Sequence, residues 1–149
     1  MPKLLSGLLR AGAFGTRNAD IGGGRFDKGT DALGSSGVEN VIFDPYNREK
    51  SHNDAALRII KAGVPTATVS NVLNVIKEPE VRQEVIQLAR YAETAYFYVY
   101  ERDGSGVGCP TRDGWQENRK LEDYIPEIAK VFAHVEVVRL GGVKMLKAW

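Results

Sequence analysis

Two hydrophobic patterns alternate along the chain, and each is typical of one type of secondary structure. Short apolar runs rich in β-branched or aromatic residues predict strands, whereas apolar positions repeated every three or four residues predict helices. We expect strands over Thr16–Ile21, Val38–Asp44, Thr66–Val72 and Ala95–Tyr100. The helical pattern extends over Leu4–Leu9, Phe26–Leu33, Ser51–Lys61, Pro79–Ala92 and Leu121–Phe132, and either Ser51 or Asn53 can cap the third helix.

The order of these elements predicts an α/β fold. Strands that alternate with helices form a mostly parallel, doubly wound sheet of the Rossmann-like type. The last two strand-like segments, 134–140 and 143–149, are separated by Gly141 and Gly142, which indicates a C-terminal antiparallel hairpin. The length of 149 residues fits one domain, 1–149, with enough chain to bury a core.

Composition and charge exclude several classes of protein. With 43% hydrophobic and 26% charged residues, the chain has the make-up of a globular domain. Twenty Lys and Arg residues against nineteen Asp and Glu give a net charge of +1, so charge does not support a nucleic-acid partner, although a local basic patch stays open. One cysteine, Cys109, and two histidines exclude an internal disulfide and a histidine-rich metal site, and we expect no metal.

The chain shows no sequence signal for a membrane. No segment approaches the roughly 18 apolar residues that a membrane span needs. The leucine-rich start is broken by Ser6, Gly7 and Arg10, so it does not fit a secretory signal. We therefore expect a cytosolic protein.

The densest candidate chemistry lies in the segment ADIGGGRFD, where Gly22, Gly23 and Gly24 follow the first expected strand. Such a turn before a helix lets a ligand approach the backbone closely and presents N–H groups to it. The dinucleotide-binding sequence GxGxxG would need a third glycine where Asp27 stands. A carboxylate there repels a pyrophosphate and suits a ligand with cationic or hydroxyl groups, which disfavours an NAD-dependent oxidoreductase.

This turn resembles the first motif of class I S-adenosylmethionine-dependent methyltransferases, an acid-x-Gly-x-Gly sequence matched here by Asp20, Gly22 and Gly24. The resemblance implies that Asp20 orients the amino group of the cofactor and that the three glycines make room for it. It also implies that Asp44, at the end of the second strand, accepts both ribose hydroxyls, a sensible pairing for a carboxylate. Pro45 and Tyr46 follow directly, and Tyr46 could stack on adenine or simply pack against the domain.

The resemblance continues in SNVLNVI, which stands at the fourth motif of the family and implies cofactor contacts from Asn71, Val72 and Leu73. Asn71 and Asn74 could also orient a substrate, and loop structure or helix capping explains both residues equally well. A long polar segment, 103–120, follows the fourth expected strand, on the side where open α/β sheets bind ligands. It is either a substrate clamp or a solvated loop. Asn71, Asn74, Arg102 and Trp115 are the candidate catalytic residues.

Three longer segments, FDPYNRE, SNVLNVIKEPEVR and DGWQENRKLEDY, resemble a narrower group, the small methyltransferases associated with DNA phosphorothioation loci and similar phage-borne proteins. The chain departs from the family in one element, because no strand is expected between Gly63 and Pro65, where the family has one that helps to hold adenine. It also has neither an Asn/Asp-Pro-Pro-Tyr/Trp sequence nor a cysteine after a proline. Methylation of base amino groups or of cytosine C5 by the usual mechanisms therefore loses support.

These observations predict a reduced class I methyltransferase fold that binds S-adenosylmethionine and transfers its methyl group to an acceptor that the sequence does not identify. Two alternatives stay open, a non-catalytic cofactor-binding protein that acts through a partner and an enzyme that cleaves the cofactor. Because the chain has almost no additional elements for substrate selection, we expect a small acceptor, a homo-oligomer or a partner subunit.

Overall fold

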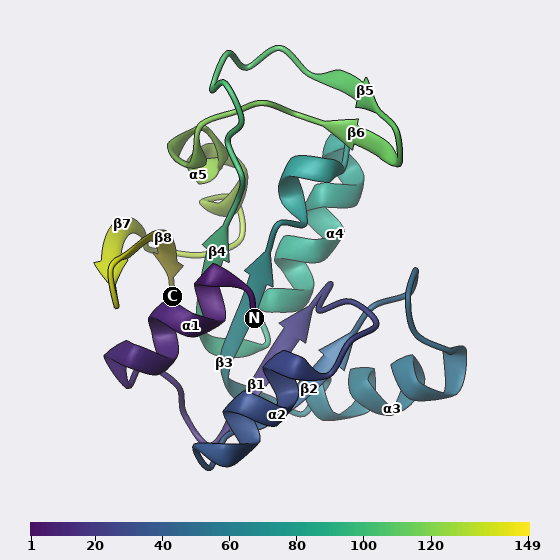
Figure 1. The fold of residues 1–149 in the computed structure, drawn as a ribbon, viewed down its shortest axis with the longest axis vertical. Coiled ribbons are helices and arrows are strands. Elements are labelled where there is room, and N and C mark those ends of the chain that lie inside the picture. Colours follow the sequence, from purple (N-terminus) through teal and green to yellow (C-terminus); the bar gives the residue numbers. More distant parts are fainter.

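All of residues 1–149 are described by a computed structural model, which is built around a six-stranded sheet (Figure 1). Across the sheet the strands lie in the order β2 (Glu39–Phe43), β1 (Arg17–Ile21), β3 (Val64–Ser70), β4 (Ala92–Tyr98), β8 (Val143–Ala148) and β7 (Val135–Leu140). The first four are parallel, and the β7–β8 hairpin joins β4 in the antiparallel sense. The predicted mostly parallel sheet and the C-terminal hairpin are confirmed.

Helices cover both faces of this sheet. The helices α1 (Lys3–Ala11) and α2 (Lys28–Ser35) lie on one face, where Leu4 and Leu8 pack against Tyr96 and Met145. The helices α3 (Lys50–Lys61), α4 (Pro79–Ala89) and α5 (Ile125–Ile128) lie on the other face. Successive side chains of a strand point to opposite faces of the sheet. Each strand therefore contributes one set of side chains to the α1–α2 face and another set to the α3–α5 face.

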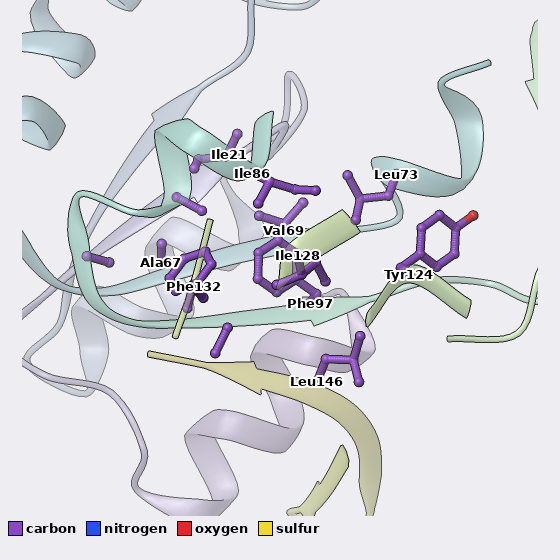
Figure 2. Close-up of a cluster of buried hydrophobic side chains, with 14 of the residues drawn as sticks. Ile21, Ala67, Val69, Leu73, Ile86, Phe97, Tyr124, Ile128, Phe132 and Leu146 are labelled. Atoms are coloured by element: carbon purple, nitrogen blue, oxygen red, sulfur yellow. The ribbon is translucent and has the colours of Figure 1, made fainter. Parts of the chain in front are cut away.

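The main hydrophobic core lies between the sheet and the α3–α5 side. Figure 2 shows part of this core, in which Ile86 of α4 and Ile128 of α5 lie against side chains of the strands. Ile60 of α3 belongs to the same cluster. Phe97 of β4 meets Phe132 edge to face, with ring centroids 6.1 Å apart. Aromatic pairs of this geometry add to the stabilisation from buried area. Phe132 is thus a core residue, although it follows the end of α5.

Several boundaries differ from the sequence expectation. Ala92 belongs to β4, where it is buried opposite Val64, and not to the preceding helix. The helix α3 begins after Glu49, and Ser51 and Asn53 do not cap it. Asn53 faces inward instead, where its amide donates to the carbonyl of Asp44 and accepts the N–H of the same residue.

The segment 103–132 also differs from a plain loop and helix. A small hairpin of β5 (Cys109–Thr111) and β6 (Gly114–Gln116) projects from its middle. The expected long helix is a 3₁₀ turn, η2 (Leu121–Tyr124), followed by the short α5, whose first turn contains Pro126. A second 3₁₀ turn, η1 (Leu73–Val75), follows β3. Proline is tolerated in the first turn of a helix because no backbone donor is needed there. Within a longer helix its ring would clash with the preceding turn, so one continuous helix through Pro126 is disfavoured.

The connection between α3 and β3 contains only Ala62 and Gly63, so no strand lies there, as expected. As a result β2 is the edge strand of the sheet. None of the helices is long and apolar enough to cross a bilayer.

A buried arginine ties the helical side together. Arg82 of α4 is only 1% exposed, because it stands on the buried face of the helix together with Ile86 and Ala89. Its guanidinium donates two hydrogen bonds to Glu127 of α5, at 2.9 and 2.8 Å, and one to Glu117 at 2.9 Å. It also donates to the carbonyls of Ile76 and Lys77, at 2.7 and 3.0 Å. Burial favours the protonated form of Glu127, but the hydrogen bonds and charge of Arg82 outweigh it and hold the pKa of Glu127 below its usual value.

Replacing Arg82 by methionine should lower the free energy of unfolding by about 3–5 kcal/mol. Glu117 and Glu127 would lose their buried cation and keep only the longer contacts to Arg119, at 3.4 and 3.3 Å. Urea denaturation followed by circular dichroism measures this difference. Arg58→Met is the matched control, since Arg58 is an exposed residue of α3 with no ion pair, and it should cost under about 0.5 kcal/mol. A loss for Arg82→Met as small as that of the control would contradict the role given to this cluster.

Candidate cofactor site

The carboxyl ends of three neighbouring parallel strands bring the candidate residues together. Asp20 is the penultimate residue of β1, Asp44 follows β2, and Asn71 follows β3. In the register of the sheet Asp20 pairs with Ile42 of β2 and with Thr68 of β3. The glycine turn starts directly after β1, so it lies between the ends of the two flanking strands.

Asp20 is a buried carboxylate, 4% exposed. One oxygen accepts the hydroxyl of Thr68 at 3.2 Å, and the other accepts the side-chain amide of Asn40 at 3.3 Å. Burial raises the pKa of Asp20; the two hydrogen bonds oppose this rise, and the nearby charge of Asp44 adds to it. A ligand with a cationic group would relieve this carboxylate, because an adjacent positive charge favours its ionised form.

Asp44 is equally buried, and the protein itself fills its hydrogen-bonding capacity. Its Oδ1 accepts the backbone N–H groups of Tyr46 and Asn47, at 3.0 and 3.1 Å. Its Oδ2 accepts the N–H of Gly24 and the side-chain amide of Asn47, both at 2.9 Å. An ionised carboxylate has about four acceptor positions, so a ribose diol must displace a protein donor. The Asn47 side chain is the simplest donor to displace, because Asn47 is exposed.

The glycine turn needs its glycines for steric and conformational reasons. Gly22 has a φ of +76°, and a Cβ atom there would lie 2.4 Å from Cγ2 of Val72. A Cβ atom on Gly23 would lie 2.7 Å from Oδ2 of Asp20. The absence of side chains therefore lets the turn lie directly over the carboxylate of Asp20 and against the side chain of Val72.

Arg48 fastens the far side of the turn. Its Nε donates to the carbonyl of Gly24 at 2.8 Å, and its Nη2 forms an ion pair with Asp27 at 2.8 Å. Asp27 precedes the first residue of α2 and its carboxylate is occupied by Arg48. The sequence pattern predicts a cationic or hydroxylated ligand next to Asp27, whereas in the structure the cation is Arg48 of the chain itself.

Two cavities lie on either side of the turn. An apolar cavity of about 350 Å³ runs beside Asp44, between α3 and α4, and is lined near the turn by Ile21, Gly22, Phe43, Pro45, Tyr46, Val72 and Ile76. A cavity of about 230 Å³ lies beside Asp20 and Gly23, under the start of α1 and α2. An elongated ligand fits this arrangement if its apolar planar part lies in the cavity beside Asp44 and its polar part lies beside Asp20. Ligand pockets generally combine apolar walls with a few polar groups in this way.

The other candidate residues have different surroundings. Leu73 is buried in the main core, 1% exposed. Asn71 is exposed, and its side chain accepts the N–H of Tyr100 at 2.8 Å. Asn74 is buried, and its side-chain amide donates to Gln116 at 3.2 Å, while its side-chain oxygen Oδ1 has no hydrogen-bond partner. Trp115 packs against Gly108 and lies under Lys77, and Arg102 lines a further cavity at the end of β4.

Sequence reasoning missed four residues that support the site, namely Asn40, Asn47, Arg48 and Thr68. Asn40 and Thr68 are polar positions within strands, a signal that the alternation of polar and apolar residues could have revealed. Asn47 and Arg48 follow Asp44 in the segment DPYNR, where a short polar turn after an acid is compatible with many structures.

Comparison with known proteins places this fold. The chain superposes on a Burkholderia thailandensis 1,6-didemethyltoxoflavin-N1-methyltransferase, solved with 1,6-didemethyltoxoflavin and S-adenosylhomocysteine, with a TM-score of 0.67 and 15% identity over 98% of this chain and 75% of that one. A protein solved in work on the conversion of a disulfide bond into a thioacetal group during echinomycin biosynthesis gives a TM-score of 0.63 and 13% identity, over 99% and 80% of the two chains. A TehB-like S-adenosylmethionine-dependent methyltransferase from Corynebacterium glutamicum gives 0.54 and 15%, over 97% and 84%.

The chain has the fold of S-adenosylmethionine-dependent methyltransferases. No family model matches its sequence. No curated protein matches it either.

Gly22→Ala should destabilise the protein more than Gly37→Ala, its matched control. Both glycines have a positive φ, +76° and +81°, but only the new methyl group at position 22 would meet other atoms. We expect a cost of about 1 kcal/mol for Gly37→Ala and a further cost of about 1–3 kcal/mol for Gly22→Ala. Thermal and urea unfolding measure both, and the double variant Gly22→Ala, Val72→Ala should recover part of the difference. Equal costs for the two single variants would refute the close packing on Val72.

Asp20→Asn should stabilise the protein in the absence of ligand near neutral pH. Because burial raises the pKa of Asp20, the native chain binds this proton more tightly than the unfolded chain, so its contribution to stability is greatest below pH 3.8 and falls as the pH rises through the raised pKa. Removing the charge should therefore raise the free energy of unfolding near neutral pH and leave it unchanged below the unfolded pKa.

Urea unfolding across this pH range tests the expectation for Asp20. Asp113→Asn is the control, since Asp113 is exposed between β5 and β6 and its carboxylate makes no hydrogen bond. A destabilised Asp20→Asn variant at neutral pH would show that the carboxylate contributes more through its hydrogen bonds than it loses by burial.

Proposed function

We propose that this chain is an S-adenosylmethionine-dependent methyltransferase. The proposal rests chiefly on one observation, the two buried carboxylates Asp20 and Asp44 on either side of a glycine turn, at the carboxyl ends of neighbouring strands in a methyltransferase fold. Open α/β sheets bind ligands at this edge. The apolar cavity beside Asp44 adds a place for a planar base.

The residues of the site fit the cofactor part by part. Asp20 would pair with its amino group, which supplies the cation that a buried carboxylate lacks. Asp44 would accept the ribose hydroxyls after the Asn47 side chain moves away. Pro45, Tyr46 and Val72 line the apolar cavity where adenine would lie, and Tyr46, 87% exposed, is free to cover it. When bound, S-adenosylmethionine supplies a methyl group on a positively charged sulfur.

The acceptor is a separate question. One structural neighbour was solved with 1,6-didemethyltoxoflavin beside S-adenosylhomocysteine, which supports a small-molecule acceptor for a chain of this size. The resemblance to phage-borne and phosphorothioation-associated proteins suggests DNA instead, but the net charge of +1 gives that reading no support. A cytosolic location and a homo-oligomer or partner subunit stay predictions.

A non-catalytic cofactor-binding protein is the second candidate. All four residues considered for catalysis are held by contacts within the protein. Asn71 bonds to the backbone of Tyr100, Asn74 bonds to Gln116, Arg102 bonds to the sulfur of Cys109, and Trp115 packs on Gly108. Methyl transfer depends mainly on alignment of the reacting atoms, so this does not contradict an enzyme. Formation of S-adenosylhomocysteine only with an acceptor would identify a transferase, and cofactor breakdown without one would identify the cleavage alternative.

Calorimetric titration should show binding of S-adenosylmethionine and S-adenosylhomocysteine, and none of NAD. Asp44→Asn should weaken both affinities by about ten- to a hundredfold, because it removes a charged acceptor from the ribose hydroxyls. Asn47→Ala should keep or strengthen binding, since it removes a donor that competes for Asp44. Circular dichroism establishes that each variant is folded.

The titration separates the possible outcomes clearly. Absence of binding by either sulfur ligand in the folded wild-type chain would overturn the proposal. Binding that Asp44→Asn leaves unchanged would place the ribose elsewhere. If binding is found, a screen with a labelled methyl group, including small aromatic compounds and DNA, identifies the acceptor class.

A further inference from the structure

A third cavity, of about 340 Å³, lies at the carboxyl end of β4. It is formed by the start of α1, by the chain after β4 and by the turn between β7 and β8, and its lining includes Lys3, Tyr98, Tyr100, Arg102 and Lys144. The start of α1 lies between this cavity, lined by Lys3, and the cavity beside Asp20, lined by Met1, Pro2 and Leu5, so the two cavities are neighbours.

The charges in this cavity are unbalanced. Lys144 is paired with Glu122, and the carboxylate of Glu101 accepts the N–H of Leu121 at 2.6 Å. Lys3 and Arg102 form no ion pair, and the only side-chain partner of the Arg102 guanidinium is the sulfur of Cys109, at 3.0 Å. The lining therefore carries an excess of positive charge, because its only carboxylate, Glu101, has one oxygen committed to the backbone, and a ligand can supply a further anion.

Two tyrosines contribute aromatic surface to the lining of the cavity. Tyr96, Tyr98 and Tyr100 alternate along one side of β4 and its continuation, so they point to the same face. Tyr96 is buried under α1, Tyr98 is half-buried against the same cluster, and Tyr100 is 60% exposed. The exposed part of this row lies where Lys3 and Arg102 also stand. Planar rings stack on such surfaces, and a cation beside them attracts a negative substituent.

We propose that this cavity is the acceptor site and that it takes a small aromatic anion, such as an aromatic carboxylate. The ring lies against Tyr98 and Tyr100, and the negative group pairs with Lys3 and Arg102. That this ligand is a methyl acceptor rests on the proposed function, whereas the binding of an aromatic anion does not.

An acceptor that is already an anion also suits the groups around it. Glu101 is the only carboxylate in the cavity lining, and its bond to Leu121 commits one of its oxygens to the backbone. An ionised oxygen can form a bond to a methyl carbon with its own lone pair, while the carbon–sulfur bond breaks and its electrons stay on sulfur. No proton leaves the acceptor, so the cavity needs no general base.

The test uses the full chain labelled with ¹⁵N, and benzoate and benzamide as probes that differ in charge but little in shape. Benzoate should shift the amide signals of residues 98–102 and 142–144 in a saturable manner. Benzamide should bind more weakly than benzoate, by up to about fivefold. Lys3→Gln and Arg102→Gln should each weaken benzoate binding by a similar factor. Lys130→Gln is the control, because Lys130 is exposed, unpaired and remote from every cavity lining described above.

The same samples are titrated with S-adenosylmethionine, so the two proposals fail separately. Benzoate binding at this cavity without cofactor binding would leave the anion site standing and overturn the methyltransferase. Cofactor binding with no benzoate shifts, with shifts elsewhere, or with equal affinity for benzamide would overturn the anion site. Unchanged benzoate affinity in both Lys3→Gln and Arg102→Gln would do the same, and the amide spectrum of each variant shows directly whether it is folded.

Discussion

One buried guanidinium, that of Arg82, holds together the half of the molecule that the sheet alone does not organise. It joins α4 to α5 through Glu127, to the chain after β6 through Glu117, and to the turn after β3 through two carbonyls. The helix α5 has only four residues and β5 and β6 have three each, lengths that cannot persist without tertiary contacts. A rigid planar fork with several donors can serve these partners at once, which a lysine cannot do.

The candidate cofactor site follows a different logic, because both of its carboxylates already have hydrogen-bond partners within the protein before any ligand arrives. Asp44 is bonded to four donors of its own chain, and burial favours the protonated form of Asp20. Ligand binding at such a site is an exchange of hydrogen bonds, so net affinity depends on how well the ligand replaces what it displaces. A site of this kind favours a ligand with a matching diol and cation over a ligand that is merely the right size.

The fold was largely predictable from local patterns, and the site only in part. The runs that form β2, β3 and β4 contain enough apolar and β-branched residues to identify, and Gly141–Gly142 marks the hairpin turn. The more polar β1, with the sequence RNADI, is marked by the glycine turn that ends it. Asp20, Asp44 and the glycine turn could be located because strand ends in a parallel sheet share one edge. Arg82 could not, because its partners Glu117 and Glu127 lie 35 and 45 positions away and a polar residue in a helix normally faces solvent. Ala92 was misplaced for a similar reason, since alanine fits the helical repeat as well as it fits the strand opposite Val64.

The packing of α1 has a consequence for the order in which the protein can fold during synthesis. Gly7 approaches the backbone of Leu140 and the side chain of Val143 so closely that a Cβ atom would lie 2.8 Å from each, and Arg10 donates to the carbonyl of Gly141 at 2.7 Å. The helix α1 therefore rests on a hairpin whose turn is synthesised 131 residues after Arg10. Until residues 135–148 have been made and have emerged, Leu4 and Leu8 lack Met145 and their part of the core, so the growing chain carries an uncovered apolar helix surface.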